Sequence, residues 1–155
     1  MANIPSPITS FLKSDLIAVV GVSRNPREPS NAIYRKMRAE GLSIVPVNPH
    51  LNSFGEDTCY PDIGSVPTRP DAVFIATHPS VSLSIVQQYG ELGIRKVWFH
   101  RSLGDGSWSG EAADECRKHG IDAIEGGCPM MFIEPVDFGH ACMRWFFQRT
   151  GKVPR

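Results

Sequence analysis

"LIAVVGVSRNPREPSNAIYRKMRAEG", residues 16–41, indicates the fold class of this chain. The stretch opens with a continuous run of apolar, mainly β-branched residues that reaches Gly21 and Val22. Such a run predicts a strand that is buried on both faces of a parallel sheet. The chain then departs from a dinucleotide fingerprint, because prolines stand where glycines at fixed spacing would follow.

A helix is expected over residues 31–40, after this long loop. Its apolar face would consist of Ala32, Ile33 and Met37. Ser30 or Asn31 can cap its first turn, and Gly41 ends it. The unit is therefore a strand, an unusually wide loop and a helix.

The same alternation continues along the chain. Further strands are predicted in "LSIVPVN", "DAVFIAT", "KVWFH" and "IDAIEG", which begin at residues 42, 71, 96 and 121. Helices are expected to end at Gly93 and Gly120, and Asp137 can cap a last helix. Strands that alternate with helices at these lengths imply right-handed crossovers. We therefore predict one α/β domain over residues 1–155, with a doubly wound, mainly parallel five-stranded sheet, helices on both faces, and a C-terminal helical extension over residues 133–155.

Two of the later helices carry predicted apolar stripes. The stripe of the first consists of Val81, Ile85, Val86 and Leu92, and that of the last helix consists of Phe138, Cys142, Trp145 and Phe146. Core positions are also predicted for Met130, Met131, Phe132 and the aromatic residues 145–147, with a dimer face as the alternative.

The composition narrows the possible function classes. Sixteen basic and sixteen acidic residues balance without a block of like charge, which argues against a general attraction to nucleic acid or to an anionic membrane. No apolar run approaches the roughly 20 residues of a membrane-spanning helix, and the first residues lack the pattern of a secretion signal. A cytoplasmic protein is expected. Four free thiols are expected at Cys59, Cys116, Cys128 and Cys142, because these cysteines form neither a close pair nor a cysteine–histidine cluster.

The residues after the first strand form the candidate ligand site. In open α/β sheets a ligand lies outside the carboxyl ends of the strands, where the strand order reverses. Gly21 would allow the backbone to approach a ligand, and Ser23 would offer a hydroxyl and backbone amides to an oxyanion. The helix start near Ser30 adds amides without intrahelical partners. Arg24 and Arg27 suit bidentate contact with phosphate.

The end of the second strand bears on the identity of a nucleotide. An NAD site uses a carboxylate about 20 residues beyond the glycine motif to bind the ribose diol. This sequence has Asn48, Pro49 and His50 there, and no acid. The absence of a carboxylate fits a ribose that carries a phosphate, as in coenzyme A (CoA) or NADP, and disfavours NAD.

Five pieces of the chain resemble a known family in their order and spacing. They are "VVGVSRNPREPSNAIYRKMRAEG", "IVPVNP", "DAVFIATHPS", "KVWFH" and "GGCPMM". Over roughly residues 12–132 the chain is similar to the stand-alone CoA-binding domain proteins. These share the Rossmann-like fold of the N-terminal domain of the succinyl-CoA synthetase α subunit. The resemblance implies CoA or an acyl-CoA as the ligand.

The resemblance also implies a set of contacts. The CoA pyrophosphate would lie over the first loop and the helix start, with Arg24 and Arg27 as its charge partners, and Asn48 would border the adenosine end. The full set of implied binding residues is Gly21, Val22, Ser23, Arg24, Arg27, Ser30, Asn31, Asn48, Pro49, Thr77, His78, Pro79, Trp98 and His100.

Three functions remain open at this point. The first is a module that binds CoA or an acyl-CoA without chemistry of its own. The second is a small NADP-dependent or other nucleotide-dependent enzyme, for which His78, His100 and His140 are candidate bases. Its candidate nucleophile would be Cys128, which the strand order could bring near His100, although a structural role is favoured for this thiol. The third is a protein that has lost the ligand and uses its aromatic C-terminal helix to form a homodimer or to bind another protein.

Overall fold

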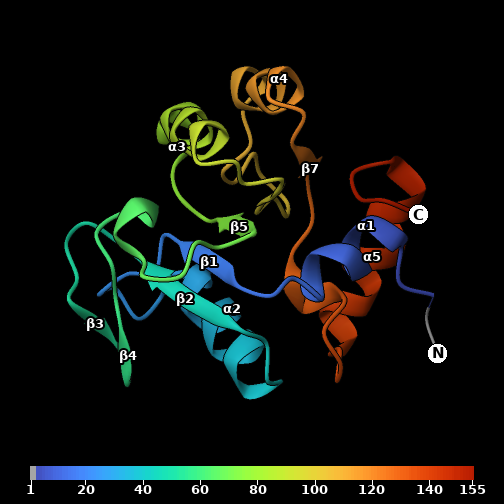
Figure 1. Ribbon diagram of the computed structural model, residues 1–155. Coiled ribbons are helices and arrows are strands. Elements are labelled where there is room, and N and C mark those ends of the chain that lie inside the picture. The colour runs from blue at the N-terminus through green and yellow to red at the C-terminus, as the bar shows by residue number, and fades with distance from the viewer. Residues whose placement is uncertain (1–2) are drawn as a thin grey trace.

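A computed structural model describes residues 3–155. Five parallel strands form its main sheet, in the spatial order β2 (Ile44–Val47), β1 (Ile17–Val20), β5 (Ala72–Ile75), β6 (Lys96–Phe99) and β7 (Asp122–Ile124). The chain first builds β2 on one side of β1 and then returns to build the remaining strands on the other side (Figure 1). The strand order therefore reverses between β1 and β5, and this is the switch point at which open α/β sheets bind ligands.

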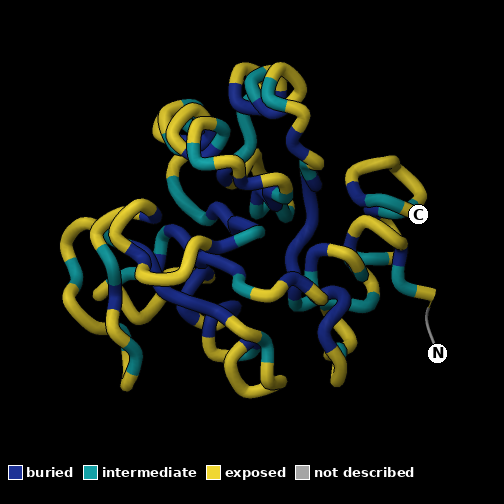
Figure 2. The backbone as a smooth tube through the Cα atoms, viewed as in Figure 1, coloured by how far each residue is buried: buried dark blue, intermediate teal, exposed yellow. Residues whose placement is uncertain are grey.

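Helices cover both faces of the sheet. They are α1 (Ser6–Leu12), α2 (Pro29–Ala39), α3 (Pro79–Glu91), α4 (Gly110–Lys118) and α5 (Phe138–Thr150), with short 3₁₀ turns η1 (Ile63–Ser65) and η2 (Pro129–Met131). One core lies between the sheet and the side that holds α1, α2, η2 and α5, and a second core lies under α3 and α4 (Figures 1 and 2). Within β1, Ile17 and Val19 belong to the first core and Ala18 and Val20 to the second, because successive side chains of a strand point to opposite faces. The predicted five-stranded, doubly wound fold is confirmed.

The start of α2 differs from the prediction. The helix begins at Pro29, after Glu28 as its N-cap, and not at residue 31. Proline is favoured at the first helical position because its missing N–H would have no intrahelical partner there. Ser30 and Asn31 therefore lie inside the first turn, where both are buried, and they do not cap it. The buried face is also corrected: it consists of Ser30, Asn31, Ile33, Tyr34 and Met37, while Ala32 is exposed.

Two predicted apolar stripes are wrong in part. In α3, Val81 is exposed, whereas Ser82 and Tyr89 are buried beside Val86. In α5 the whole predicted stripe faces outward, and Phe147 on the other side of the helix enters the first core together with Val153. Of the other predicted core residues, Met131 and Phe132 are buried and Met130 is half-buried.

Two elements have no counterpart in the sequence prediction. The helix α1 packs Ile8 and Phe11 into the first core. A hairpin of β3 (Ser53–Phe54) and β4 (Asp57–Thr58) replaces a predicted loop. Within residues 3–155, no helix is long and apolar enough to cross a membrane, and no group of three or more His, Cys, Asp and Glu side chains could hold a metal ion.

Candidate functional site

A cavity of about 430 Å³ lies at the switch point, beside the carboxyl ends of β1, β5 and β6. We call it the switch-point cavity. Its lining residues are Glu28, Pro29, Ser30, Ala76, Thr77, His78, His100, Gly106 and Ser107. They come from the start of α2 and from the loops that follow β5 and β6, so elements far apart in the sequence build one site.

Gly21 brings the loops after β1 and β5 into backbone contact. Its φ is +112°, a value that side chains rarely allow, and a Cβ there would lie 2.6 Å from the carbonyl oxygen of Ala76. The Ser30 hydroxyl then donates to the Gly21 carbonyl oxygen at 2.7 Å. The start of α2 is thereby held against the end of β1.

Asn31 organises the first loop, residues 21–28. Its Oδ1 accepts a hydrogen bond from the Ser23 amide at 2.8 Å, and its Nδ2 donates to the carbonyl oxygens of Ser23 at 2.8 Å and Asn25 at 3.0 Å. The Ser23 hydroxyl accepts from the Asn25 amide at 3.1 Å. The predicted role of the Ser23 amide is therefore corrected, because this amide already has a partner within the chain, while the Ser23 hydroxyl acts only as an acceptor here and keeps its O–H for a ligand.

Asn48 joins the first loop to the end of β2. Its Nδ2 donates to the Val22 carbonyl oxygen at 2.6 Å, and its Oδ1 accepts from the His50 amide at 2.7 Å. Arg24 reaches the same segment, where its Nη2 donates to the His50 carbonyl oxygen at 2.8 Å. The predicted site residues at the ends of β1 and β2 are thus brought together, with Pro49 exposed beside them.

Arg27 is exposed directly before the α2 N-cap. Among the described residues, its guanidinium group has no hydrogen bond or ion pair, and no side chain caps the first turn of α2. The first-turn amides of a helix lack intrahelical partners and carry partial positive charge. Pro29 has no N–H and the Asn31 amide donates to the Glu28 carbonyl oxygen at 3.1 Å, so the start of α2 offers the Ser30 amide and the positive end of the helix dipole beside Arg27.

Thr77 contributes a hydroxyl with an unusual environment. Its Oγ1 is buried and has no hydrogen-bond partner among residues 3–155. An unpaired buried hydroxyl costs free energy, about 1–3 kcal/mol, and such groups occur at binding sites where a ligand can satisfy them. The next two residues start α3: the Nδ1 of exposed His78 accepts from the Ser80 amide at 3.2 Å, and Pro79 occupies the first helical position.

His100 forms the deep wall of the cavity. Burial lowers the pKa of its imidazole, and the nearby His140 lowers it further, so the ring is neutral at pH 7. The following loop folds back over it at Gly106, whose φ is +59° and where a Cβ would lie 2.0 Å from the His100 carbonyl oxygen. The buried Ser107 fastens this loop, since its hydroxyl donates to the Ile75 carbonyl oxygen at 2.6 Å.

Sequence reasoning missed five lining residues of the cavity. They are Glu28, Pro29, Ala76, Gly106 and Ser107. The signal for the last two was the run of glycine and serine over residues 104–110, which follows the carboxyl end of the fourth predicted strand.

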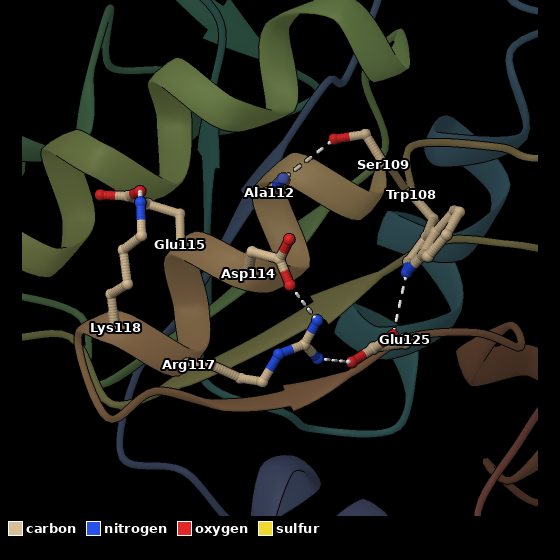
Figure 3. A network of polar contacts seen from close by, with 8 residues as sticks. All are labelled: Trp108, Ser109, Ala112, Asp114, Glu115, Arg117, Lys118 and Glu125. Atoms are coloured by element: carbon tan, nitrogen blue, oxygen red, sulfur yellow. Dashed lines mark hydrogen bonds and ion pairs between the residues drawn. The ribbon is translucent and has the colours of Figure 1, made fainter.

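A polar network holds the β6–α4 loop in place (Figure 3). Trp108 donates from its indole Nε1 to Oε2 of Glu125 at 3.1 Å, and Arg117 forms an ion pair with the same carboxylate at 3.0 Å. Ser109 caps α4 by accepting from the Ala112 amide at 3.1 Å. The network ties the segment that carries Gly106 and Ser107 to the end of β7.

Comparison with known proteins assigns the chain to a family. The sequence model of the CoA binding domain matches residues 15–134, which include every element from β1 to η2. The chain belongs to the CoA binding domain family.

Individual proteins are similar to this chain in sequence or in fold. The acetate–CoA ligase [ADP-forming] II of Archaeoglobus fulgidus is 30% identical over 81 residues, which are 51% of this chain and 12% of the ligase. The chain therefore spans about one eighth of that relative. A hypothetical protein from Pyrococcus horikoshii OT3 superposes with a TM-score of 0.75 at 23% identity, over 88% of this chain and 98% of that one. The dinucleotide forming acetyl-coenzyme A synthetase 1 of Ca. Korarchaeum cryptofilum, in complex with phosphate and ADP, gives a TM-score of 0.65 at 24% identity, over 77% of this chain and 26% of that one.

Trp98 does not line the switch-point cavity of this CoA binding domain. Its side chain is fully buried in the first core, where the indole Nε1 donates to the Gly126 carbonyl oxygen at 2.9 Å. It packs edge-to-face against Phe11 at a centroid distance of 5.3 Å. The prediction of a ligand contact is wrong because side chains alternate along β6, and Trp98 points away from the cavity edge into the core.

Cys128 is also a core residue. It is 4% exposed, and burial raises the pKa of its thiol to about 12, so the thiol is protonated at pH 7. Among residues 3–155, no hydrogen bond joins it to the imidazole of His100. The Nδ1 of His140, the third candidate base, instead forms a hydrogen bond with the Asp137 carboxylate at the start of α5.

Proposed function

We propose that this CoA binding domain binds CoA or an acyl-CoA in the switch-point cavity, and that it performs no chemistry of its own on the ligand. The observation that carries the proposal is the cavity itself, with the unpartnered Thr77 hydroxyl in its wall and the uncapped first turn of α2 at its rim. The family assignment supplies the ligand class.

The charge distribution suggests how the ligand is oriented. The pyrophosphate would lie at the start of α2, where the Ser30 amide, the helix dipole and Arg27 provide positive charge. Arg24, held over the segment after β2, would face the phosphorylated ribose. Asn48 would position this segment through its bonds to Val22 and His50, and it keeps one N–H and one lone pair of its side-chain amide for the ligand.

Two features support binding without catalysis. The Cys128 thiol is protonated and buried in the core, which makes it a poor nucleophile. The Nδ1 of His78 is engaged at the N-cap of α3, and that of His140 is hydrogen-bonded to Asp137. His100 remains as a neutral polar group in the cavity wall, suited to a hydrogen bond with the ligand.

We expect CoA to bind with measurable heat, and Arg27→Ala to weaken this binding about tenfold or more, because a hydrogen bond to a charged group contributes about 1.5–3 kcal/mol. Isothermal titration calorimetry with CoA, acetyl-CoA, dephospho-CoA and NADP tests this. Arg95→Ala is the matched control, since Arg95 is exposed at the amino end of β6, at the other end of the strands from the cavity.

Arg24→Ala should reduce the preference for CoA over dephospho-CoA. No binding of CoA at millimolar concentration, or tighter binding of NADP, would contradict the proposal.

Thr77→Val should change the free and the bound protein in opposite directions. Valine matches the shape of threonine, so the variant removes a buried unpaired hydroxyl and should raise the free energy of unfolding of the ligand-free protein by about 1 kcal/mol. It should also weaken CoA binding several-fold, because the ligand loses a partner. Thermal unfolding with and without CoA measures both effects. If CoA raised the melting temperature of Thr77→Val and of the unchanged protein by the same amount, the ligand would not contact Thr77.

A further inference from the structure

The outer face of α5 is a cluster of exposed apolar side chains. It consists of Phe138, Ala141, Cys142, Trp145 and Phe146, which together line a shallow hollow on the surface. Phe138 is 85% exposed, Trp145 57% and Phe146 51%. Three large aromatic side chains on one exposed helix face are typical of a surface that binds another molecule.

The opposite side of α5 shows that this helix has two apolar faces. Phe147 is fully buried and Met143 packs against the same core. A surface helix normally has one apolar stripe, which faces the core, and a second apolar stripe is normally covered by another molecule or element. The outer face of α5 is therefore expected to be covered as well.

The charges at the two ends of the outer face differ in sign. Glu134 and Asp137 lie directly before α5 at its N-terminal end, and the Arg149 guanidinium group lies over the Trp145 ring near its C-terminal end, whereas Lys152 lies over the ring of the buried Phe147. Two such helices that pack antiparallel would bring acidic ends against basic ends, and would also align their dipoles favourably. A parallel pair would bring like charges together. The face is thus complementary to a second copy of itself in one orientation.

From this complementarity we infer that a second copy of this chain covers the outer face of α5, with the two helices antiparallel across a two-fold axis. Phe138, Cys142 and Trp145 follow one another at spacings of four and three residues, which forms a continuous seam along a helix. Cys142 stands at the middle of the seam. The two-fold axis would therefore pass close to it, and each Phe138 would face the region of Trp145 and Phe146 of the other copy.

The available area favours a weak dimer. Large aromatic side chains bury about 150–250 Å² each, so the exposed parts of the three rings provide on the order of 400 Å² per copy. Arg149 adds to the surface, because its guanidinium group lies 4.2 Å from the centroid of the Trp145 ring. Two copies would bury on the order of 800 Å² in total, which is below the roughly 1,200–2,000 Å² of standard specific interfaces and typical of weak, transient ones, so we expect a dissociation constant of about 10–100 µM.

Sedimentation velocity over a range of protein concentrations tests the inference. The full chain should pass from monomer to dimer, and Trp145→Glu should weaken association at least about tenfold, because it removes a central aromatic anchor and places like charges opposite one another. Leu103→Glu is the matched control, since Leu103 is 81% exposed in the loop between β6 and α4. Circular dichroism melts check that each variant is folded.

Two further measurements test the orientation. Cys142 is the exposed one of the four cysteines, so a short bismaleimide should link two copies at Cys142 and should fail with Cys142→Ala. Glu134→Arg and Arg149→Glu should each weaken the dimer, and the double variant should restore it by reversing both charges. Parallel helices would show no such rescue.

Several results would overturn the inference. The first is a protein that stays monomeric up to about 0.5 mM, a concentration well above the expected dissociation constant. The second is a dimer whose stability Trp145→Glu does not change. The third is cross-linking that persists in Cys142→Ala. Binding of the monomer to phosphatidylserine vesicles through Trp145, without self-association, would assign the face to a lipid surface instead. None of these results depends on CoA, so they leave the proposed ligand site untouched.

Discussion

Asn31→Ala should lower the free energy of unfolding by about 3 kcal/mol and abolish CoA binding. The side chain is 1% exposed and makes three hydrogen bonds to the backbone of the first loop. Its removal leaves the amide and the carbonyl oxygen of half-buried Ser23 without these partners, at about 1–3 kcal/mol for each group that water does not reach, while the carbonyl oxygen of exposed Asn25 can bind water instead. The loop would then relax away from the conformation that faces the ligand.

Urea unfolding and calorimetry measure the two effects of this substitution. Asn52→Ala is the matched control, because Asn52 is exposed in the segment before β3, and it should change the stability by less than about 0.5 kcal/mol. Asn31→Asp keeps an acceptor for the Ser23 amide but replaces both donors with a carboxylate next to two carbonyl oxygens, so it should also be destabilising. An Asn31→Ala protein with normal stability and normal CoA affinity would show that the loop is held by other contacts.

Gly21→Ala should destabilise the fold by more than about 3 kcal/mol. Two costs combine: the positive φ of +112°, and a Cβ that would lie 2.6 Å and 2.8 Å from the carbonyl oxygen and carbon of Ala76. Backbone atoms cannot move aside as a flexible side chain can, so the ends of β1 and β5 would have to separate. That separation would open the switch-point cavity and remove CoA binding even in the fraction of protein that remains folded.

Gly41→Ala separates the two costs. Gly41 has a φ of +78°, and a Cβ there would meet nothing within 4 Å. This control should therefore show only the cost of the left-handed conformation, about 1–2 kcal/mol. If urea unfolding gave the same loss for both variants, the close approach of the two loops would not contribute to stability.

The strands were predictable because a strand that is buried on both faces consists of a continuous run of apolar residues. Each strand of the main sheet except β7 is almost entirely buried, and each lies inside a predicted apolar run. The α1 helix and the β3–β4 hairpin were missed for the opposite reason. They are short, and their stability depends on packing against the sheet and α2 rather than on their own periodicity.

The candidate site was predictable in its location but not in its contacts. The rule for open sheets pointed to the loops after the strands, and the cavity lies there. The roles of Ser23 and Asn31 depend on their mutual hydrogen bonds, which form only when the loop closes on the start of α2. Ser107 enters the site because its loop folds back onto the end of β5, a contact across 32 residues.

The sequence by itself determined the α/β class, the order of the elements, the family and the loops that surround the switch-point cavity. These follow from local patterns, since hydrophobic periodicity and turn residues act over a few positions. Only the tertiary structure decided which way Trp98 points, which face of α5 is buried, and that Thr77 carries an unpaired hydroxyl. The physical reason is that burial and hydrogen bonding of these side chains depend on partners distant in sequence, such as Ala76 opposite Gly21, which come together only when the sheet has formed.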